Sequence, residues 1–92
     1  MSIFLLTYDL NKEIKRPPIV QEVKKSPYWA QLSESSYSID TAETVAQVRT
    51  RFARYIDSND SFYVIKLSAP WGGQGPKEVN DWLAQRLGSA SG

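Results

Sequence analysis

The sequence predicts one α+β domain with the element order strand, helix, strand, strand, helix, strand and a final helix. Two apolar runs, residues 3–8 and 61–67, carry the branched and aromatic side chains that favour strands. Between residues 41 and 56, apolar side chains recur every three or four positions, as on one face of a helix. The length of 92 residues fits a single small domain.

The first strand ends in an acidic residue. The run 3–8 is almost continuously apolar, so both faces of this strand should be covered by other parts of the protein. Alternate side chains should form two sets on opposite faces, Ile3, Leu5 and Thr7 on one and Phe4, Leu6 and Tyr8 on the other. Asp9 follows where the strand leaves the sheet, so its carboxylate is held by its neighbours yet reaches solvent. It is therefore a candidate site residue, although Asp9-Leu10-Asn11 is also ordinary turn chemistry.

A basic loop should connect this strand to the first helix. Pro17 and Pro18 interrupt a helix interior but are tolerated in a first turn. We expect a short helix over residues 18–25 that ends at Ser26-Pro27, because the residue before a proline disfavours helical backbone. Its inward side chains should be Ile19, Val20 and Val23.

Residues 28–40 have strand character at both ends and a polar middle. Either two strands meet at a tight turn or bulge near residues 34–36, or one long strand bends there. The serines of this segment could line a hydroxyl-rich site, or they could belong to the solvated face of an edge strand.

The segment 40–56 contains the clearest helical pattern. Asp40-Thr41-Ala42-Glu43 resembles a capping box with aspartate as the cap, although Thr41 is an alternative cap. The helix should reach about residue 56, and residues 57–60 have turn composition. Its inward stripe should comprise Val45, Val48, Phe52, Tyr55 and Ile56.

The second apolar strand and a last helix complete the pattern. The strand 61–67, like the first, is apolar on both faces, and a glycine-rich loop follows at 69–76. A helix over 76–87 should turn inward the side chains of Val79, Trp82, Leu83 and Leu87. Arg86 falls within that stripe, so it should extend its charge to solvent or meet an acid on a partner. Residues 88–92 have linker composition, so the domain should span 1–87, followed by a flexible tail or a cloning scar.

This order of elements is that of the ferredoxin-like βαββαβ plan with one added helix. In that plan the helices cover only one face of the sheet. Because strands 3–8 and 61–67 are apolar on both faces, the second face needs a cover from the last helix, from a second copy of the chain, or from both. We therefore expect a homodimer that packs sheet to sheet.

The composition excludes several kinds of chemistry. The chain has no cysteine and no histidine, which excludes disulfides, thiolate catalysis and the usual histidine bases and zinc ligands. Carboxylates, hydroxyls and oxygen-bound metals such as Mg²⁺ or Mn²⁺ remain. Eleven Lys and Arg stand against ten Asp and Glu, so the chain is not strongly basic. No apolar run approaches the ~20 residues that span a membrane, and the N-terminus lacks the pattern of a signal peptide, so we expect a cytoplasmic protein.

Three short segments, in order along the chain, match motifs of a known group. The apolar first strand ends in Tyr8-Asp9-Leu10-Asn11, residues 29–35 read Trp-Ala-Gln-Leu-Ser-Glu-Ser, and Asp57-Ser58-Asn59-Asp60 precedes the apolar residues 62–65. In these features the chain resembles the small CRISPR-associated adaptation proteins (the Cas-two family) and their VapD-like and SinR-like relatives. The resemblance spans about residues 1–67, and the SinR-like branch is the most similar.

The resemblance implies a ferredoxin-like homodimer that acts on nucleic acid. Members are described as metal-dependent nucleases on RNA or DNA, in antiviral defence or as VapD-type endoribonuclease toxins of toxin–antitoxin pairs. They are also described as non-catalytic structural subunits that bind DNA or a protein partner. In the enzymatic case Asp9 is the implied catalytic and metal-binding residue, with the Asp9 side chains of two protomers holding Mg²⁺ or Mn²⁺ at the dimer axis. Ser33 or Ser35 would orient water or phosphate.

The chain departs from the pattern of this group after Leu67. Typical adaptation subunits end with a strand that crosses to the partner, whereas here a glycine-rich loop and a helix take its place. The geometry of the dimer and any docking to an integrase partner therefore do not follow from the resemblance.

Basic residues near Asp9 and on the helix that ends near residue 56 are candidates for contacting nucleic acid. They are Lys12, Lys15, Arg16, Arg51 and Arg54. If a two-fold axis groups them, they could follow a phosphate backbone. With Glu13, Glu22 and Glu43 interspersed, they could equally form an ordinary solvated surface.

Overall fold

The computed structural model describes residues 1–90, which form four strands, three α-helices and one short 3₁₀ helix. In chain order these are β1 (Ser2–Asp9), η1 (Glu13–Lys15), α1 (Arg16–Val23), β2 (Tyr28–Ser33), β3 (Ser36–Thr41), α2 (Val45–Ala53), β4 (Ser61–Lys66) and α3 (Lys77–Leu87). The α+β class predicted from the sequence is confirmed.

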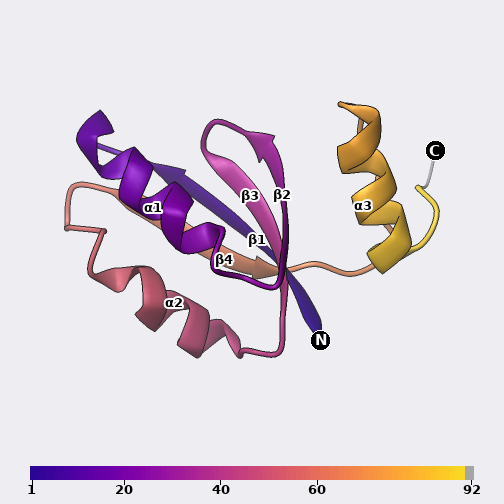
Figure 1. The fold of residues 1–92 in the computed structure, drawn as a ribbon, viewed down its shortest axis with the longest axis horizontal. Coiled ribbons are helices and arrows are strands. Elements are labelled where there is room, and N and C mark those ends of the chain that lie inside the picture. Colours follow the sequence, from indigo (N-terminus) through magenta and orange to yellow (C-terminus); the bar gives the residue numbers. More distant parts are fainter. Residues whose placement is uncertain (91–92) are drawn as a thin grey trace.

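The four strands form one antiparallel sheet in the order β2-β3-β1-β4, so β1 lies inside the sheet and β2 and β4 are its edges. Phe4 of β1 lies opposite Ile39 of β3 and Lys66 of β4, which defines the register. The helices α1 and α2 lie together on one side of the sheet, whereas α3 stands apart from them beside β2 (Figure 1). The sheet and its helices are consistent with the ferredoxin-like plan.

The hydrophobic core lies between the sheet and the helices α1 and α2. The set of β1 side chains predicted to share one face, Phe4, Leu6 and Tyr8, is buried there. The other core residues are Ile19 and Val23 of α1, Tyr37 and Ile39 of β3, and Val48 and Phe52 of α2. The predicted alternation along β1 is therefore confirmed.

The opposite face of the sheet is covered over only part of its width. The helix α3 packs on β2 and reaches β3 through Arg86, which pairs with Asp40 at 3.0 Å, so the acid predicted for Arg86 lies in the same chain. Over β1 and β4 residues 1–90 leave this face open, and Tyr63 and Ile65 are 62% and 49% exposed. We call this surface the open half-face; it comprises Leu5, Thr7 and Asp9 of β1 and Ser61, Tyr63 and Ile65 of β4.

The helix α2 begins later than the sequence predicted. Asp40 and Thr41 belong to β3 and pair with β1, so strand pairing keeps both residues extended. The N-cap is Thr44, whose hydroxyl accepts the N–H of Gln47 at 3.1 Å, while the Gln47 side chain accepts the N–H of Thr44 at 2.8 Å. The capping box predicted at residues 40–43 is therefore wrong, and so is the inward position of Val45, which is exposed.

Two other helix boundaries differ from the prediction by a few residues: α1 spans 16–23 in place of 18–25, and α2 ends at Ala53 in place of residue 56. Of the two options for residues 28–40, the structure has two strands joined by a tight turn at residues 34–35. Gly88 ends α3 with φ 90°, and its N–H donates to the Ala84 carbonyl at 2.9 Å. The predicted tail 88–92 lies partly outside the described residues. None of the helices in residues 1–90 has the length and apolar character needed to cross a membrane.

Candidate functional site

Asp9 is the last residue of β1 and is exposed at one end of the sheet. Its register partner is Ser61, the first residue of β4. Because side chains alternate along a strand, Asp9 projects from the same face as Leu5 and Thr7, opposite to the core face of Tyr8. The carboxylate therefore belongs to the open half-face.

The donor set around Asp9 limits how a metal ion could bind there. Within residues 1–90, no three side chains of the metal-binding types His, Cys, Asp and Glu lie close enough together to hold an ion. Mg²⁺ is often held by one or two carboxylates, with waters and substrate phosphates completing its shell. Asp9 fits such a site when the remaining ligands come from a second copy of the chain, from water or from nucleic acid.

The β2–β3 hairpin reaches the end of the sheet where Asp9 lies. Ser35 lies in the turn of this hairpin, and its carbonyl accepts the N–H of Tyr8 at 3.0 Å. Ser33 instead belongs to the edge strand β2, which β3 separates from β1. Of the two serines predicted to orient water or phosphate, Ser35 is thus the one beside the end of β1.

Lys15 contacts two aspartates in the turn before β4. Its ammonium group ion-pairs with Asp57 and lies 2.7 Å from Asp60 Oδ2, while Asp60 Oδ1 accepts the N–H of Asn11 at 2.8 Å. The backbone N–H of Asp57, Lys15 and the N–H of Asn11 together lower the pKa of Asp60 to about 2. Hydrogen bonds to the two aspartates raise the pKa of Lys15. Lys15, a candidate nucleic-acid-binding residue, therefore already has two acidic partners. Its ion pairs connect the segment after β1 to the turn before β4.

Arg16 is held between η1 and the β2–β3 hairpin. Its guanidinium contacts the Glu13 carboxylate at 2.7 and 3.0 Å and donates to the Glu34 carbonyl and to Ser35 Oγ, the latter at 3.1 Å. It also lies over the Tyr8 ring, 5.7 Å from the ring centre. Arg16 is therefore near the end of β1, but its charge is matched by Glu13.

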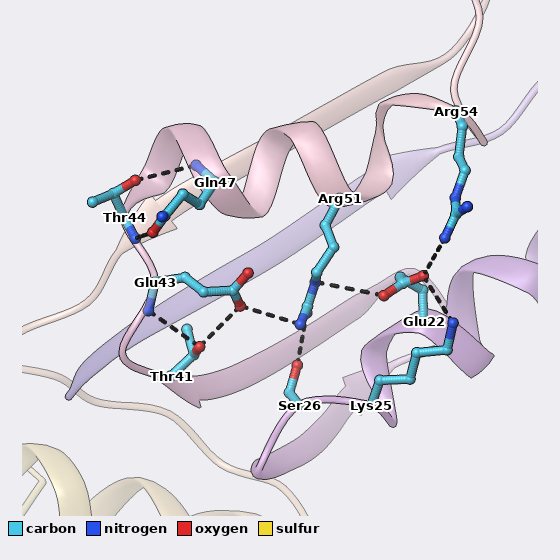
Figure 2. A network of polar contacts seen from close by, with 9 residues as sticks. All are labelled: Glu22, Lys25, Ser26, Thr41, Glu43, Thr44, Gln47, Arg51 and Arg54. Carbon is cyan, nitrogen blue, oxygen red and sulfur yellow. Dashed lines mark hydrogen bonds and ion pairs between the residues drawn. The ribbon is translucent and has the colours of Figure 1, made fainter.

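Glu22 of α1 is a buried carboxylate, 3% exposed, that lies between Arg51, Arg54 and Lys25 in the polar network of Figure 2. Its Oε1 accepts hydrogen bonds from Tyr55 at 3.0 Å, from Arg54 at 3.2 Å and from Lys25 at 3.4 Å. Burial raises the pKa of Glu22, but these donors outweigh burial and hold the pKa below its ordinary value. The charged carboxylate therefore joins α1 to α2.

The candidate residues Arg51 and Arg54 belong to this network. Arg51 lies 3.6 Å from Glu22 and 3.1 Å from Glu43, and it donates to Ser26 Oγ at 2.8 Å (Figure 2). Arg54 pairs with Glu22 at 3.2 Å, although its side chain remains 66% exposed. Binding of nucleic acid by either arginine would therefore have to compete with these contacts inside the protein.

Four basic side chains have no ion pair within residues 1–90. They are Lys12, Lys24, Arg49 and Lys66. Of the five predicted nucleic-acid-binding residues, only Lys12 belongs to this set. The sequence could not show which basic residues would be unpaired, because several of the ion pairs that engage the others link residues far apart along the chain, such as Lys15 and Asp57.

No protein-family model matches the sequence.

Proposed function

We propose that the protein is a nucleic-acid-binding homodimer that hydrolyses phosphodiester bonds with a divalent metal ion held by two Asp9 carboxylates. The observation that carries this proposal is the position of Asp9 on the open half-face. A second copy packed on that surface lies beside the end of β1 and can bring its own Asp9 close. The motif resemblance of residues 1–67 and a ferredoxin-like assignment of the sheet support the same arrangement.

The open half-face has the character of a protein interface. Tyr63 and Ile65 are exposed on one face of the sheet, beside their half-buried register partners Thr7 and Leu5. Contiguous exposed apolar side chains mark contact sites, and full burial of a side chain as large as isoleucine contributes about 1.5–3 kcal/mol. In a two-fold dimer, a residue near the axis meets its own copy. An axis near the end of β1 therefore brings the two Asp9 side chains together.

Asp9 and Lys12, at this end of the sheet, have different roles in the proposed reaction. Two Asp9 carboxylates and waters are the oxygen ligands that Mg²⁺ or Mn²⁺ prefers. When bound, such an ion supplies an activated water and stabilises charge on the phosphate. Asp9 is held in place because β1 pairs with a strand on each side. Lys12, exposed and without an ion pair in residues 1–90, provides a positive charge for a neighbouring phosphate.

A non-catalytic subunit that binds DNA or a protein partner is the second candidate. The observation that favours its protein-partner form is the internal pairing of four candidate basic residues, Lys15, Arg16, Arg51 and Arg54, which leaves fewer free cations for a phosphate backbone. In that case Asp9 is a strand-end residue and takes no part in cleavage. If the enzyme cleaves RNA, the protein could be an endoribonuclease toxin of the VapD type, which is the third candidate.

Cleavage assays separate these functions. Labelled single-stranded RNA and double-stranded DNA are incubated with Mg²⁺ or Mn²⁺, and with a chelator. The wild type should cleave one of them only when metal is present, and Asp9→Asn should slow cleavage about a hundredfold or more, as for loss of a catalytic group. Asp81→Asn, at an exposed carboxylate of α3, is the matched control and should cleave like the wild type. Equal rates for the two variants would refute the role of Asp9, and no cleavage at all would favour the non-catalytic subunit.

Sedimentation measures the dimer independently of activity. Ile65→Glu places a charge on the open half-face and should give a folded monomer, with circular dichroism reporting the fold. Val45→Glu changes an exposed apolar residue of α2 in the same way and should leave the dimer intact. A wild-type protein that sediments as a monomer would refute the dimer.

A further inference from the structure

A groove runs along the β2 edge of the sheet, between that strand and the first turns of α3. Its volume is about 530 Å³, and it is lined by residues 29–34 and by Pro76, Glu78, Val79 and Trp82. This volume lies within the range of about 300–1,000 Å³ found for ligand sites. The groove is on the opposite sheet edge from β4, so it is separate from the open half-face.

One wall of the groove is the outer edge of β2. Within residues 1–90, this strand has β3 on one side and no strand on the other, so backbone N–H and C=O groups face the groove. Such an edge is a template for pairing with another extended chain. The pairing of β2 with β3 is regular from Tyr28 to Gln31 and becomes irregular between Gln31 and Ser33. The stretch 28–31 is therefore the part best shaped to accept an added strand.

The groove combines an apolar surface with unpaired negative charge. Ala30, Leu32 and Val79 supply aliphatic surface, and Trp29 and Trp82 supply aromatic surface. Its two charged lining residues are Glu34 in the hairpin turn and Glu78 in the first turn of α3, and neither has an ion pair within residues 1–90. An extended segment that carries both apolar and basic side chains is complementary to this surface, because the apolar side chains can pack against the aliphatic and aromatic lining and the basic ones can meet the two glutamates.

We propose that this groove binds a basic, extended segment of a partner protein, which pairs with β2 as a fifth strand and packs its apolar side chains against α3. The backbone edge supplies hydrogen bonds that do not depend on sequence, and the pockets beside α3 select apolar residues at alternate positions. Glu34 and Glu78, which lie on the hairpin and on α3, favour a segment that carries positive charge. The proposal does not depend on metal, on Asp9 or on the dimer.

Peptide binding tests the proposal directly. The probe is a fluorescein-labelled octapeptide of alternating valine and arginine with blocked termini, titrated against the full chain and followed by anisotropy. It should bind more tightly than about 1 mM. The same peptide with glutamate in place of arginine should bind at least about tenfold more weakly, because like charges then face each other. Methylation of alternate backbone nitrogens should also weaken binding about tenfold, through lost hydrogen bonds to β2.

Two variants and a spectrum locate the peptide. Glu78→Gln should weaken binding about twofold to fivefold, the range for an exposed charge pair. Asp81→Asn removes the same charge from α3 at a position outside the groove lining and should leave the affinity unchanged. Amide chemical-shift changes should concentrate in residues 28–34 and 76–82. No binding of the basic peptide, equal binding of the acidic one, equal effects of the two variants, or shifts confined to β4 would each overturn the proposal. Self-association of the protein through β2 in place of peptide binding would also overturn it.

Discussion

Glu22→Gln isolates the charge of the buried carboxylate that joins α1 to α2. Glutamine keeps the shape of the side chain but removes the charge shared by the donors Tyr55, Arg54 and Lys25. Breaking a buried ion pair destabilises proteins by about 3–5 kcal/mol, and a hydrogen bond to a charged group contributes about 1.5–3 kcal/mol. Because the Arg54 and Lys25 side chains are 66% and 63% exposed, water can solvate them in the variant. We therefore expect the free energy of unfolding to fall by about 2–3 kcal/mol.

Urea unfolding followed by tryptophan fluorescence measures this loss at neutral pH. For a domain of this size it corresponds to a Tm lower by roughly 10–20 °C. Glu13→Gln is the matched control, because Glu13 also pairs with an arginine but its side chain is 74% exposed. Its effect on the free energy of unfolding should be much smaller than that of Glu22→Gln, because water screens an exposed ion pair. Equal effects of the two variants would refute the reasoning that burial makes Glu22 important.

Acid titration of the same variant gives an independent check. Because the pKa of Glu22 in the folded protein lies below its ordinary value of 4.5, the stabilisation is complete above pH 4.5 and is lost as the pH falls through the lower folded value. The wild type should thus lose more stability on acidification than Glu22→Gln, and the two curves should converge. If the stabilities of the two proteins fell in parallel with pH, the charge of Glu22 would not stabilise the folded state.

Three further perturbations test other contacts of the fold. Thr44→Ala removes the α2 cap and should lower the free energy of unfolding by about 1 kcal/mol, whereas Thr50→Ala, on the exposed side of that helix, should change it by less than about 0.5 kcal/mol. Arg86→Gln breaks the contact with Asp40 and should lower stability by about 1–3 kcal/mol in urea unfolding. Asp60, with its pKa lowered to about 2, should stabilise the fold above pH 3.8 and lose this effect below it, so Asp60→Asn should show a weaker acid transition by circular dichroism.

The fold elements that could be predicted from the sequence are those with a local signal. The alternation of β1 follows from its own residues, and the core face of Phe4, Leu6 and Tyr8 matches the prediction. The start of α2 has no such local signal. Asp40 and Thr41 have the composition of a helix cap, but pairing with β1 makes them strand residues. A contact with residues almost forty positions earlier in the chain outweighs the local capping preference.

The candidate site shows the same division between local and distant information. Asp9 could be placed at a strand end because the apolar run stops there. The ion pairs of Lys15 with Asp57 and of Arg54 with Glu22 could not be predicted, since each joins residues more than thirty positions apart. The groove between β2 and α3 was missed for a similar reason, because Glu34 and Glu78 approach the same space only after α3 has folded back over the sheet.

The groove lies at the β2 edge of the sheet and the open half-face lies over β1 and β4, so the two proposed surfaces should act independently. Three strand spacings of about 4.8 Å, or roughly 14 Å, separate β2 from β4, and an added strand outside β2 lies farther still from Ile65. Sites at that distance without shared partners have additive effects. The monomeric variant Ile65→Glu should therefore bind the valine–arginine peptide within about twofold of the wild type, and Glu78→Gln should still dimerise. A tenfold loss of peptide affinity in the monomer would show instead that dimerisation shapes the groove. The partner segment would then bind the dimer in preference to the monomer.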